Sequence, residues 1–159
     1  MAVYWSRQAF SASQLIGAAP RRQMAAVRAA GDARAMMRIE RFLCALRNAG
    51  RRAILIVDNS CGDGRLLIRA AKRARKLGFV AIEAQGYDRS PDHVARAAHA
   101  AALAGRDPAI GFCFRVREDG APLPVEDAEV DLVLAAEDED DGAEIARVAV
   151  PTALIVNHG

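Results

Sequence analysis

The chain has 159 residues, of which 52% are hydrophobic and 26% are charged, and its formal net charge is +2 at pH 7. This composition is typical of one globular domain with a sizeable core, so we expect residues 1–159 to form a single domain. No apolar stretch approaches the roughly 20 residues that a membrane span needs, which excludes a membrane-spanning chain. The N-terminus lacks the pattern of a signal peptide, which argues against export.

The cysteine content favours a cytoplasmic protein. Cys44, Cys61 and Cys113 are an odd number of thiols, and no two of them form a C-x-x-C pair. We therefore expect reduced cysteines, with neither a disulfide framework nor a zinc site.

Charge is distributed unevenly along the chain. Residues 1–80 carry 16 Lys and Arg against 4 Asp and Glu, whereas residues 81–159 carry 6 against 16. The favoured interpretation is that solvated faces of opposite charge compensate each other within one molecule or across a dimer. The alternative is a nucleic-acid surface, which is weakened because only 5% of residues are aromatic and none interleaves a basic stretch.

The apolar pattern predicts strands and helices in alternation after an N-terminal segment. Residues 1–19 show little periodicity and are expected to form an arm. Gly31 followed by Asp32 predicts a helix end and a new N-cap, so the helical segment 20–50 would hold two helices, at 20–30 and 32–49. A Rossmann-like core is expected over 53–159, with strands at 53–57, 79–87, 110–116, 130–135 and 152–157, and helices at 65–77, 91–104 and 143–148.

A glycine turn joins the first expected strand to the helix that follows it. Five apolar residues, 53–57, run into Asp58, and Gly62 and Gly64 follow one residue apart. Because glycine has no Cβ, the backbone can bend sharply there and a ligand can approach it closely. Such a unit is typical of nucleotide-like ligand sites at the carboxyl end of a parallel sheet. The dinucleotide pattern G-x-G-x-x-G is incomplete, since Leu67 replaces its third glycine, and no P-loop pattern is present.

From about residue 53 to residue 136 the sequence resembles the class I S-adenosylmethionine-dependent methyltransferases. Four features in the family's order carry the resemblance: D-x-x-C-G-D-G-R-L-L at 58–67, G-Y-D-R-S-P at 86–91, E-D-G-A-P-L-P-V-E-D-A-E-V-D-L-V-L at 118–134, and 24 positions between Gly64 and Asp88. The resemblance implies a three-layer, Rossmann-like α/β fold. Its mostly parallel sheet would have the order 3-2-1-4-5 and lack the last two strands of the complete family sheet.

The resemblance also implies S-adenosyl-L-methionine as the cofactor. The loop 58–64 would lie against the methionine part and the ribose, and Asp88 would accept hydrogen bonds from both ribose hydroxyls. Asp119 would take the adenine amino group, with the Gly120 N–H available to a ring nitrogen. The alternatives are an ordinary solvated acid at position 88 and a plain turn residue at 119. The expected cofactor-binding residues are Asp58, Ser60, Cys61, Gly62, Asp63, Gly64, Asp88, Arg89, Asp119, Gly120 and Ala136.

Several positions depart from the family pattern. Ser60 stands where the family usually has its first glycine, and Arg89 stands where an apolar residue commonly stacks on adenine. The segment 135–138 lacks the Asp/Asn-Pro-Pro-Tyr/Phe of amino-methylating enzymes. No metal is expected. The alternative is a metal site in which Glu137 or Asp138 binds the ion together with Asn157 and His158. His93 and His99 are expected to be surface or packing residues.

The resemblance predicts a methyltransferase acting on an acceptor that the sequence does not identify. The reaction would be in-line attack by an acceptor atom on the sulfonium methyl, which relies on positioning, so no catalytic residue is named. The alternative is a non-catalytic binding or assembly module that acts with a partner. Strand 152–157 is apolar and uncharged, and as the expected edge of the sheet it predicts a homodimer unless the N-terminal segments cover it.

Overall fold

The computed structural model describes residues 21–118, 120–136 and 141–158 of the chain. Helices and strands alternate through most of this length. The helices are α1 (Arg21–Asn48), α2 (Arg65–Lys76), α3 (Pro91–Leu103) and α4 (Gly142–Val148). The strands are β1 (Ala53–Asp58), β2 (Ala81–Asp88), β3 (Ile110–Val116), β4 (Val130–Ala136) and β5 (Ala149–His158).

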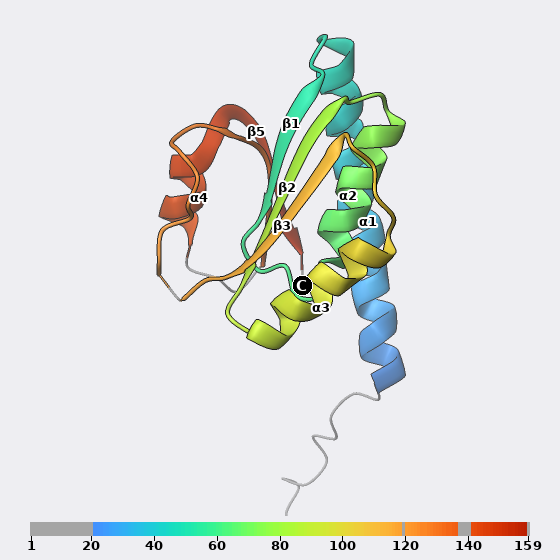
Figure 1. Cartoon of the computed structure of the whole chain (residues 1–159), viewed down its shortest axis with the longest axis vertical. Helices are drawn as coiled ribbons and strands as arrows, with labels where there is room; N and C mark the ends of the chain where they lie inside the picture. Colours follow the sequence, from blue (N-terminus) through green and yellow to red (C-terminus); the bar gives the residue numbers. More distant parts are fainter. Residues whose placement is uncertain (1–20, 119, 137–140, 159) are drawn as a thin grey trace, which may run out of the picture.

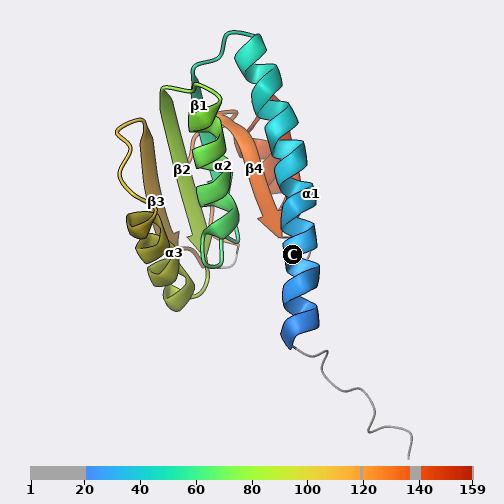
Figure 2. The ribbon, with the colours of Figure 1, turned by 90° about the vertical axis from the view of Figure 1, so that its right-hand side faces the viewer.

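The five strands form one sheet in the order β3-β2-β1-β4-β5, and every neighbouring pair is parallel. The predicted Rossmann-like fold and strand order are confirmed. Helices α1, α2 and α3 lie on one face of the sheet and α4 lies on the other (Figures 1 and 2). Because all the strands run the same way, their carboxyl ends meet at one edge, where Asp58 ends β1 and Asp88 ends β2.

An apolar core lies on each face of the sheet. The larger core packs α1 and α2 against the strands and includes Ile39, Leu43, Ile56, Leu67 and Leu132. The smaller core packs α4 against the opposite face and includes Val57, Val133, Ile145 and Val148. Burying one such side chain contributes about 1.5–3 kcal/mol. These contacts fix both β1 and α2, and therefore hold the glycine turn between them in place.

The structure contradicts the predicted helix break at Gly31 and Asp32. Helix α1 runs without interruption from Arg21 to Asn48. The surrounding residues are mostly Ala, Arg and Met, which favour helix, and one interior glycine costs only about 1 kcal/mol relative to alanine. The Asp32 carboxylate lies 3.6 Å from the Arg69 guanidinium of α2, so it joins two helices and does not begin one.

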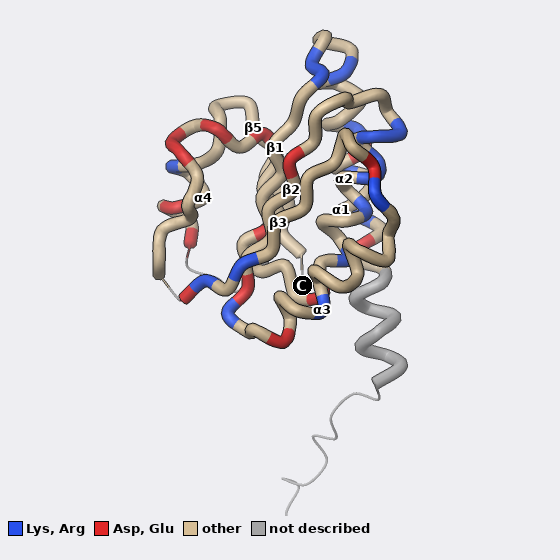
Figure 3. The backbone as a smooth tube through the Cα atoms, viewed as in Figure 1, with Lys and Arg blue, Asp and Glu red and all other residues tan. Residues whose placement is uncertain are grey.

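The arginines of α2 form ion pairs within the molecule. Figure 3 shows the basic residues of α2 on one side of the sheet and acidic residues around α4 on the other. The pairs on α2 are Arg65 with Asp63, Arg69 with Asp32, Arg73 with Glu40, and Arg75 with Asp107. Three of these pairs lie within residues 1–80, and the pair of Arg75 with Asp107 joins the basic part of the chain to its acidic part. Among the described residues, no helix is long and apolar enough to cross a membrane.

Candidate functional site

The turn between β1 and α2 is left-handed at both glycines. Gly62 has φ +52° and Gly64 has φ +71°, values that residues with a Cβ rarely adopt. The Gly64 N–H donates to the Cys61 carbonyl at 2.8 Å, which closes the turn. The Cys61 N–H donates to the Tyr87 carbonyl at 2.8 Å, which ties the turn to the end of β2.

The two glycines face different surroundings. A Cβ at Gly64 would lie 2.9 Å from the Ala97 Cβ and 3.0 Å from the Phe114 ring, so Gly64 permits close packing of the turn against α3 and β3. A Cβ at Gly62 would meet no described protein atom within 4 Å. Gly62 therefore presents its backbone to open space, as a ligand-binding turn requires.

Asp88 faces this turn from the end of β2. Its Oδ2 accepts the Gly62 N–H at 2.9 Å, and its Oδ1 accepts the Ser90 N–H at 2.8 Å. His93 Nδ1 lies 3.0 Å from Oδ1, so that nitrogen carries the proton if the carboxylate is ionised. Burial opposes ionisation of Asp88, but these three donors outweigh it and lower its pKa below the ordinary value of 3.8. The carboxylate is therefore a charged acceptor at neutral pH.

Asp58 lies beneath the turn and is almost fully buried. Its side chain is 1% exposed; Oδ1 accepts the Ser60 N–H at 3.3 Å and lies 3.3 Å from His158 Nε2. Within the described part of the chain, Oδ2 has no hydrogen-bond partner. A buried carboxylate oxygen without a donor is costly in a folded protein.

A pocket of about 380 Å³ lies beside the Gly62 turn and Asp88 at the carboxyl edge of the sheet, and the buried Asp58 does not line it. It is lined by Asp32, Ser60, Cys61, Gly62, Asp63, Arg65, Leu66, Asp88, His93, Arg96 and His158. Five of these residues (Ser60, Cys61, Gly62, Asp63 and Asp88) belong to the set predicted from sequence to hold the cofactor.

Five titratable side chains of the pocket were not among the residues predicted to bind the cofactor: Asp32, Arg65, His93, Arg96 and His158. Asp32 comes from α1, which the sequence pattern does not place near the turn, and His158 comes from the end of β5. His93 contacts Asp88 directly, so the prediction that it is a surface or packing residue missed its place in the site. The available signal was its position in the first turn of α3, the helix that follows Asp88.

Of the other predicted residues that the structure describes, none lines the pocket: Asp58, Gly64, Arg89, Gly120 and Ala136. Arg89 is exposed, and Gly120 is an exposed residue with φ +70°. Ala136 is the last residue of β4, and Asp119 lies outside the described residues. Burial, with the nearby Asp58 and Asp88, raises the pKa of the Cys61 thiol far above its usual range, so Cys61 is not a nucleophile at neutral pH.

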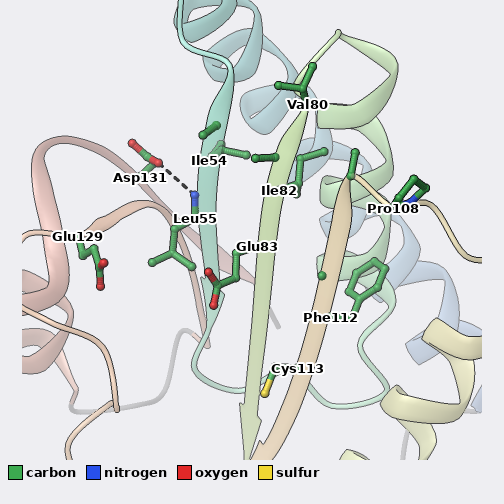
Figure 4. Close-up of a pocket in the computed structure, with 14 residues that line it drawn as sticks. Ile54, Leu55, Val80, Ile82, Glu83, Pro108, Phe112, Cys113, Glu129 and Asp131 are labelled. Carbon is green, nitrogen blue, oxygen red and sulfur yellow. Dashed lines mark hydrogen bonds between the residues drawn. The ribbon is translucent and has the colours of Figure 1, made fainter.

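A larger hollow of about 630 Å³ lies elsewhere, over the amino-terminal halves of β1, β2 and β3 (Figure 4). Here β1 and β4 diverge, and the Asp131 Oδ2 accepts the Leu55 N–H at 3.1 Å. Arg51 lies 2.6 Å from the same carboxylate. Asp131 of β4 therefore has a structural role, since it binds both Arg51 and the backbone of β1. The hollow contains none of the residues predicted to bind a cofactor, and it lies away from the glycine turn.

The alternative metal set falls partly outside the described residues, so the structure does not test it. No group of three His, Cys, Asp or Glu residues there is arranged to hold a metal ion. Glu137 and Asp138 lie outside the described residues, and His158 contacts Asp58.

Comparison with known proteins gives matches to solved structures alone. No family model and no curated protein matches the chain. A geranyl diphosphate methyltransferase solved with GPP and sinefungin matches with a TM-score of 0.54 and 21% identity, over 67% of this chain and 38% of that one. A putative S-adenosyl-L-methionine-dependent methyltransferase from Methanococcus maripaludis matches with a TM-score of 0.52 and 22% identity, over 77% and 56%. A SAM-dependent methyltransferase from Aquifex aeolicus matches with a TM-score of 0.50 and 21% identity, over 70% and 59%.

The chain therefore has the fold of the class I S-adenosylmethionine-dependent methyltransferases. It spans 38–59% of the length of these three structures. At 21–22% identity, the likeness shows the fold alone.

Proposed function

We propose that the chain binds S-adenosyl-L-methionine in the 380 Å³ pocket and acts as a methyltransferase. One observation carries the proposal: the Gly62 turn and the Asp88 carboxylate line the same pocket at the carboxyl ends of β1 and β2. In open α/β sheets, ligands bind in the crevice at this edge. The methyltransferases of matching fold support the choice of cofactor.

The groups present fit this cofactor. Asp88 is an ionised acceptor suited to ribose hydroxyls, and its Oδ2 accepts one hydrogen bond from the chain. Gly62 leaves room for close approach of a ligand. None of these features requires a metal ion.

The chain's contribution to the reaction would be positioning. The bound cofactor supplies an electrophilic methyl group on a sulfonium. The Gly62 turn and Asp88 would fix the cofactor, so that an acceptor atom can approach opposite the breaking C–S bond. Because such alignment accounts for much of the barrier reduction, the lack of an activated nucleophile at Cys61 is compatible with the reaction.

Calorimetric titration tests the proposal. S-adenosylmethionine and S-adenosylhomocysteine should each bind once per chain, and Asp88→Ala should weaken binding by about 1.5–3 kcal/mol, the range for a hydrogen bond to a charged group. Asp92→Ala is the matched control, since Asp92 is an exposed acid in the first turn of α3, the helix that follows Asp88. Unchanged affinity in a folded Asp88→Ala protein would remove the ribose assignment.

We also propose that the protein is cytoplasmic and forms a homodimer through β5. All three cysteines are free thiols, which suits a reducing compartment.

In the described part of the sheet, β5 is an edge strand, and Ile155 is 42% exposed on it. Arg38 of α1 donates to the Ile155 carbonyl at 3.1 Å, which covers one acceptor of that strand. Light scattering should show a dimer that Ile155→Lys dissociates, and a monomeric wild-type protein at tens of micromolar would contradict this.

A further inference from the structure

The amino edge of the sheet, where the strands begin, is rich in basic side chains. Helices α1, α2 and α3 all end at this edge, and the connections 49–52, 77–80 and 104–109 lead from them into β1, β2 and β3. Figure 3 shows Lys and Arg residues gathered around the ends of α1 and α2, at the top of the view. The basic residues of this edge are Arg47, Arg51, Arg52, Lys72, Arg75, Lys76 and Arg106.

Hydrogen bonds hold the three connections together as one surface. Arg47 of α1 donates to the Leu77 carbonyl at 3.1 Å, and Lys72 of α2 donates to the Ala104 carbonyl at 2.6 Å. A carbonyl carries no net charge, so these bonds fix the two cations in place without neutralising them. Because neighbouring strands lie about 4.8 Å apart, the connections into β1 and β3 are separated by about 10 Å.

Most of the positive charge at this edge has no described carboxylate against it. Arg51 is paired with Asp131, and Arg75 is paired with Asp107. The other three basic residues make neither an ion pair nor a side-chain hydrogen bond with any residue that the structure describes, and all three are exposed: Arg52, Lys76 and Arg106. Their charges therefore face solvent.

Two further acids lie at this end of the sheet but belong to its other face. Glu83 and Glu129 line the 630 Å³ hollow (Figure 4). Glu83 is in register with Leu55, which packs against the core beneath α4, so the Glu83 side chain points away from α2. The Glu129 N–H donates to the Val148 carbonyl at the end of α4. The excess positive charge on the side of α1, α2 and α3 is therefore left in place.

The chemistry of this edge fits the phosphate backbone of a nucleic-acid duplex. A duplex carries one negative charge per about 1.7 Å of its axis, or about six over the 10 Å that the three connections span. Single strands are held largely by bases that stack on aromatic side chains. Phe79 is the one aromatic residue of the three connections, and it is fully buried beneath the Arg47 guanidinium, which lies 5.5 Å from its ring centroid. The edge therefore offers contacts to phosphate and none to bases.

Little apolar surface accompanies these charges. Val80 and Leu103 are the large apolar side chains exposed at this edge, at 54% and 75%. A membrane-bound surface inserts a whole apolar face, and a stable protein interface has an apolar centre with few charges. A polyanion bound through its backbone suits the edge better than either.

We propose that the amino edge is a docking surface for duplex nucleic acid, which contacts the three exposed cations and the carbonyl-bound Arg47 and Lys72. Contacts to phosphate carry no sequence information, so binding is independent of base sequence. The surface lies at the opposite end of the strands from the glycine turn, so a docked duplex leaves the 380 Å³ pocket open. This inference does not depend on the cofactor. The scarcity of aromatic residues argues against single strands, but it does not argue against a duplex.

Fluorescence anisotropy with labelled RNA and DNA duplexes of about 20 base pairs tests the proposal over a series of salt concentrations. The test variant combines three changes at positions where the side chain makes no described contact, so the fold should be kept: Arg52→Ala, Lys76→Ala and Arg106→Ala. The control removes the same charge from exposed positions on α1 and β3: Arg34→Ala, Arg41→Ala and Arg115→Ala. Circular dichroism checks that both variants are folded.

The wild type should bind both duplexes with a Kd of about 1–100 μM at physiological salt, and the slope of log K against log salt should be about −4 for five cations. The test variant should lose at least about tenfold in affinity and about 2–3 in slope, whereas the control should keep most of both. No binding by the wild type, or equal losses in the two variants, would overturn the proposal. Tighter binding to single strands than to duplexes would also overturn it, as would binding to phosphatidylserine vesicles with none to duplexes, which would indicate a membrane surface.

Discussion

The Gly62 N–H donates a hydrogen bond of 2.9 Å to Oδ2 of Asp88, which lies 26 positions later in the chain. This bond joins the glycine turn after β1 to the acid that ends β2. It holds the carboxylate against the turn before any ligand is present. The two groups that the proposed cofactor needs are therefore parts of one preformed unit.

The two turn glycines should respond differently to substitution. Gly64→Ala should lower the melting temperature markedly, because its Cβ would lie 2.9 Å from the Ala97 Cβ at a left-handed backbone angle. Gly62→Ala has no described neighbour to meet and should cost about 1–2 kcal/mol of stability through its backbone angle alone. Its larger effect should be on S-adenosylhomocysteine binding. Thermal melts and calorimetry on both variants would measure the difference, and equal stabilities would contradict the packing role of Gly64.

His93 should orient Asp88 for binding. His93→Ala removes the Nδ1 donor that lies 3.0 Å from Asp88 Oδ1, so the carboxylate should become less fixed and affinity for S-adenosylhomocysteine should fall by about 1 kcal/mol. His93→Asn keeps a hydrogen-bond donor close to the helix and should recover part of the lost affinity. His99→Ala, an exposed residue on the same helix, is the control. Identical affinities for His93→Ala and the wild type would contradict the positioning role.

Stability should decline in acid through Asp141. Hydrogen bonds from Arg117 favour the charged form of Asp141 and lower its pKa below the ordinary value of 3.8, so in the window between these two values the unfolded chain binds more protons than the folded one. The stabilising contribution is thus fully present above about pH 4 and is lost as the pH falls through the lowered pKa. Urea unfolding at a series of pH values should show a shallower acid decline for Asp141→Asn. Parallel curves for the variant and the wild type would contradict the assignment.

The sequence predicted the layout of the sheet because its signals are local. Apolar runs mark the five strands, and Ser90 before Pro91 marks the start of α3, where the Ser90 hydroxyl accepts the His93 N–H at 3.3 Å as a cap. The continuity of α1 was not predicted, because a glycine followed by an aspartate is a common signal for the end of one helix and the N-cap of the next. The packing of Ala35 and Ile39 against the sheet outweighs that local signal.

The site could be predicted only where its residues belong to one segment of sequence. The turn 60–64 and Asp88 are recognisable by spacing from the strands that precede them. Asp32 and the contact between Arg117 and Asp141 depend on how distant elements pack, and no periodicity or motif indicates them. The sequence indicates His158 only as an alternative metal ligand. The roles of the predicted residues toward a cofactor stay predictions that binding experiments can test.

The most direct test of the central claim is an NMR titration of the ¹⁵N-labelled wild-type protein with S-adenosylhomocysteine. We predict saturable shifts, with one ligand per chain, in the amides of Ser60, Gly62, Asp63, Asp88 and His93, which line the 380 Å³ pocket. Shifts confined to residues 81–83 and 111–113, in the larger hollow, would contradict the assignment of the site. The absence of any shift at millimolar ligand would contradict the proposed function itself.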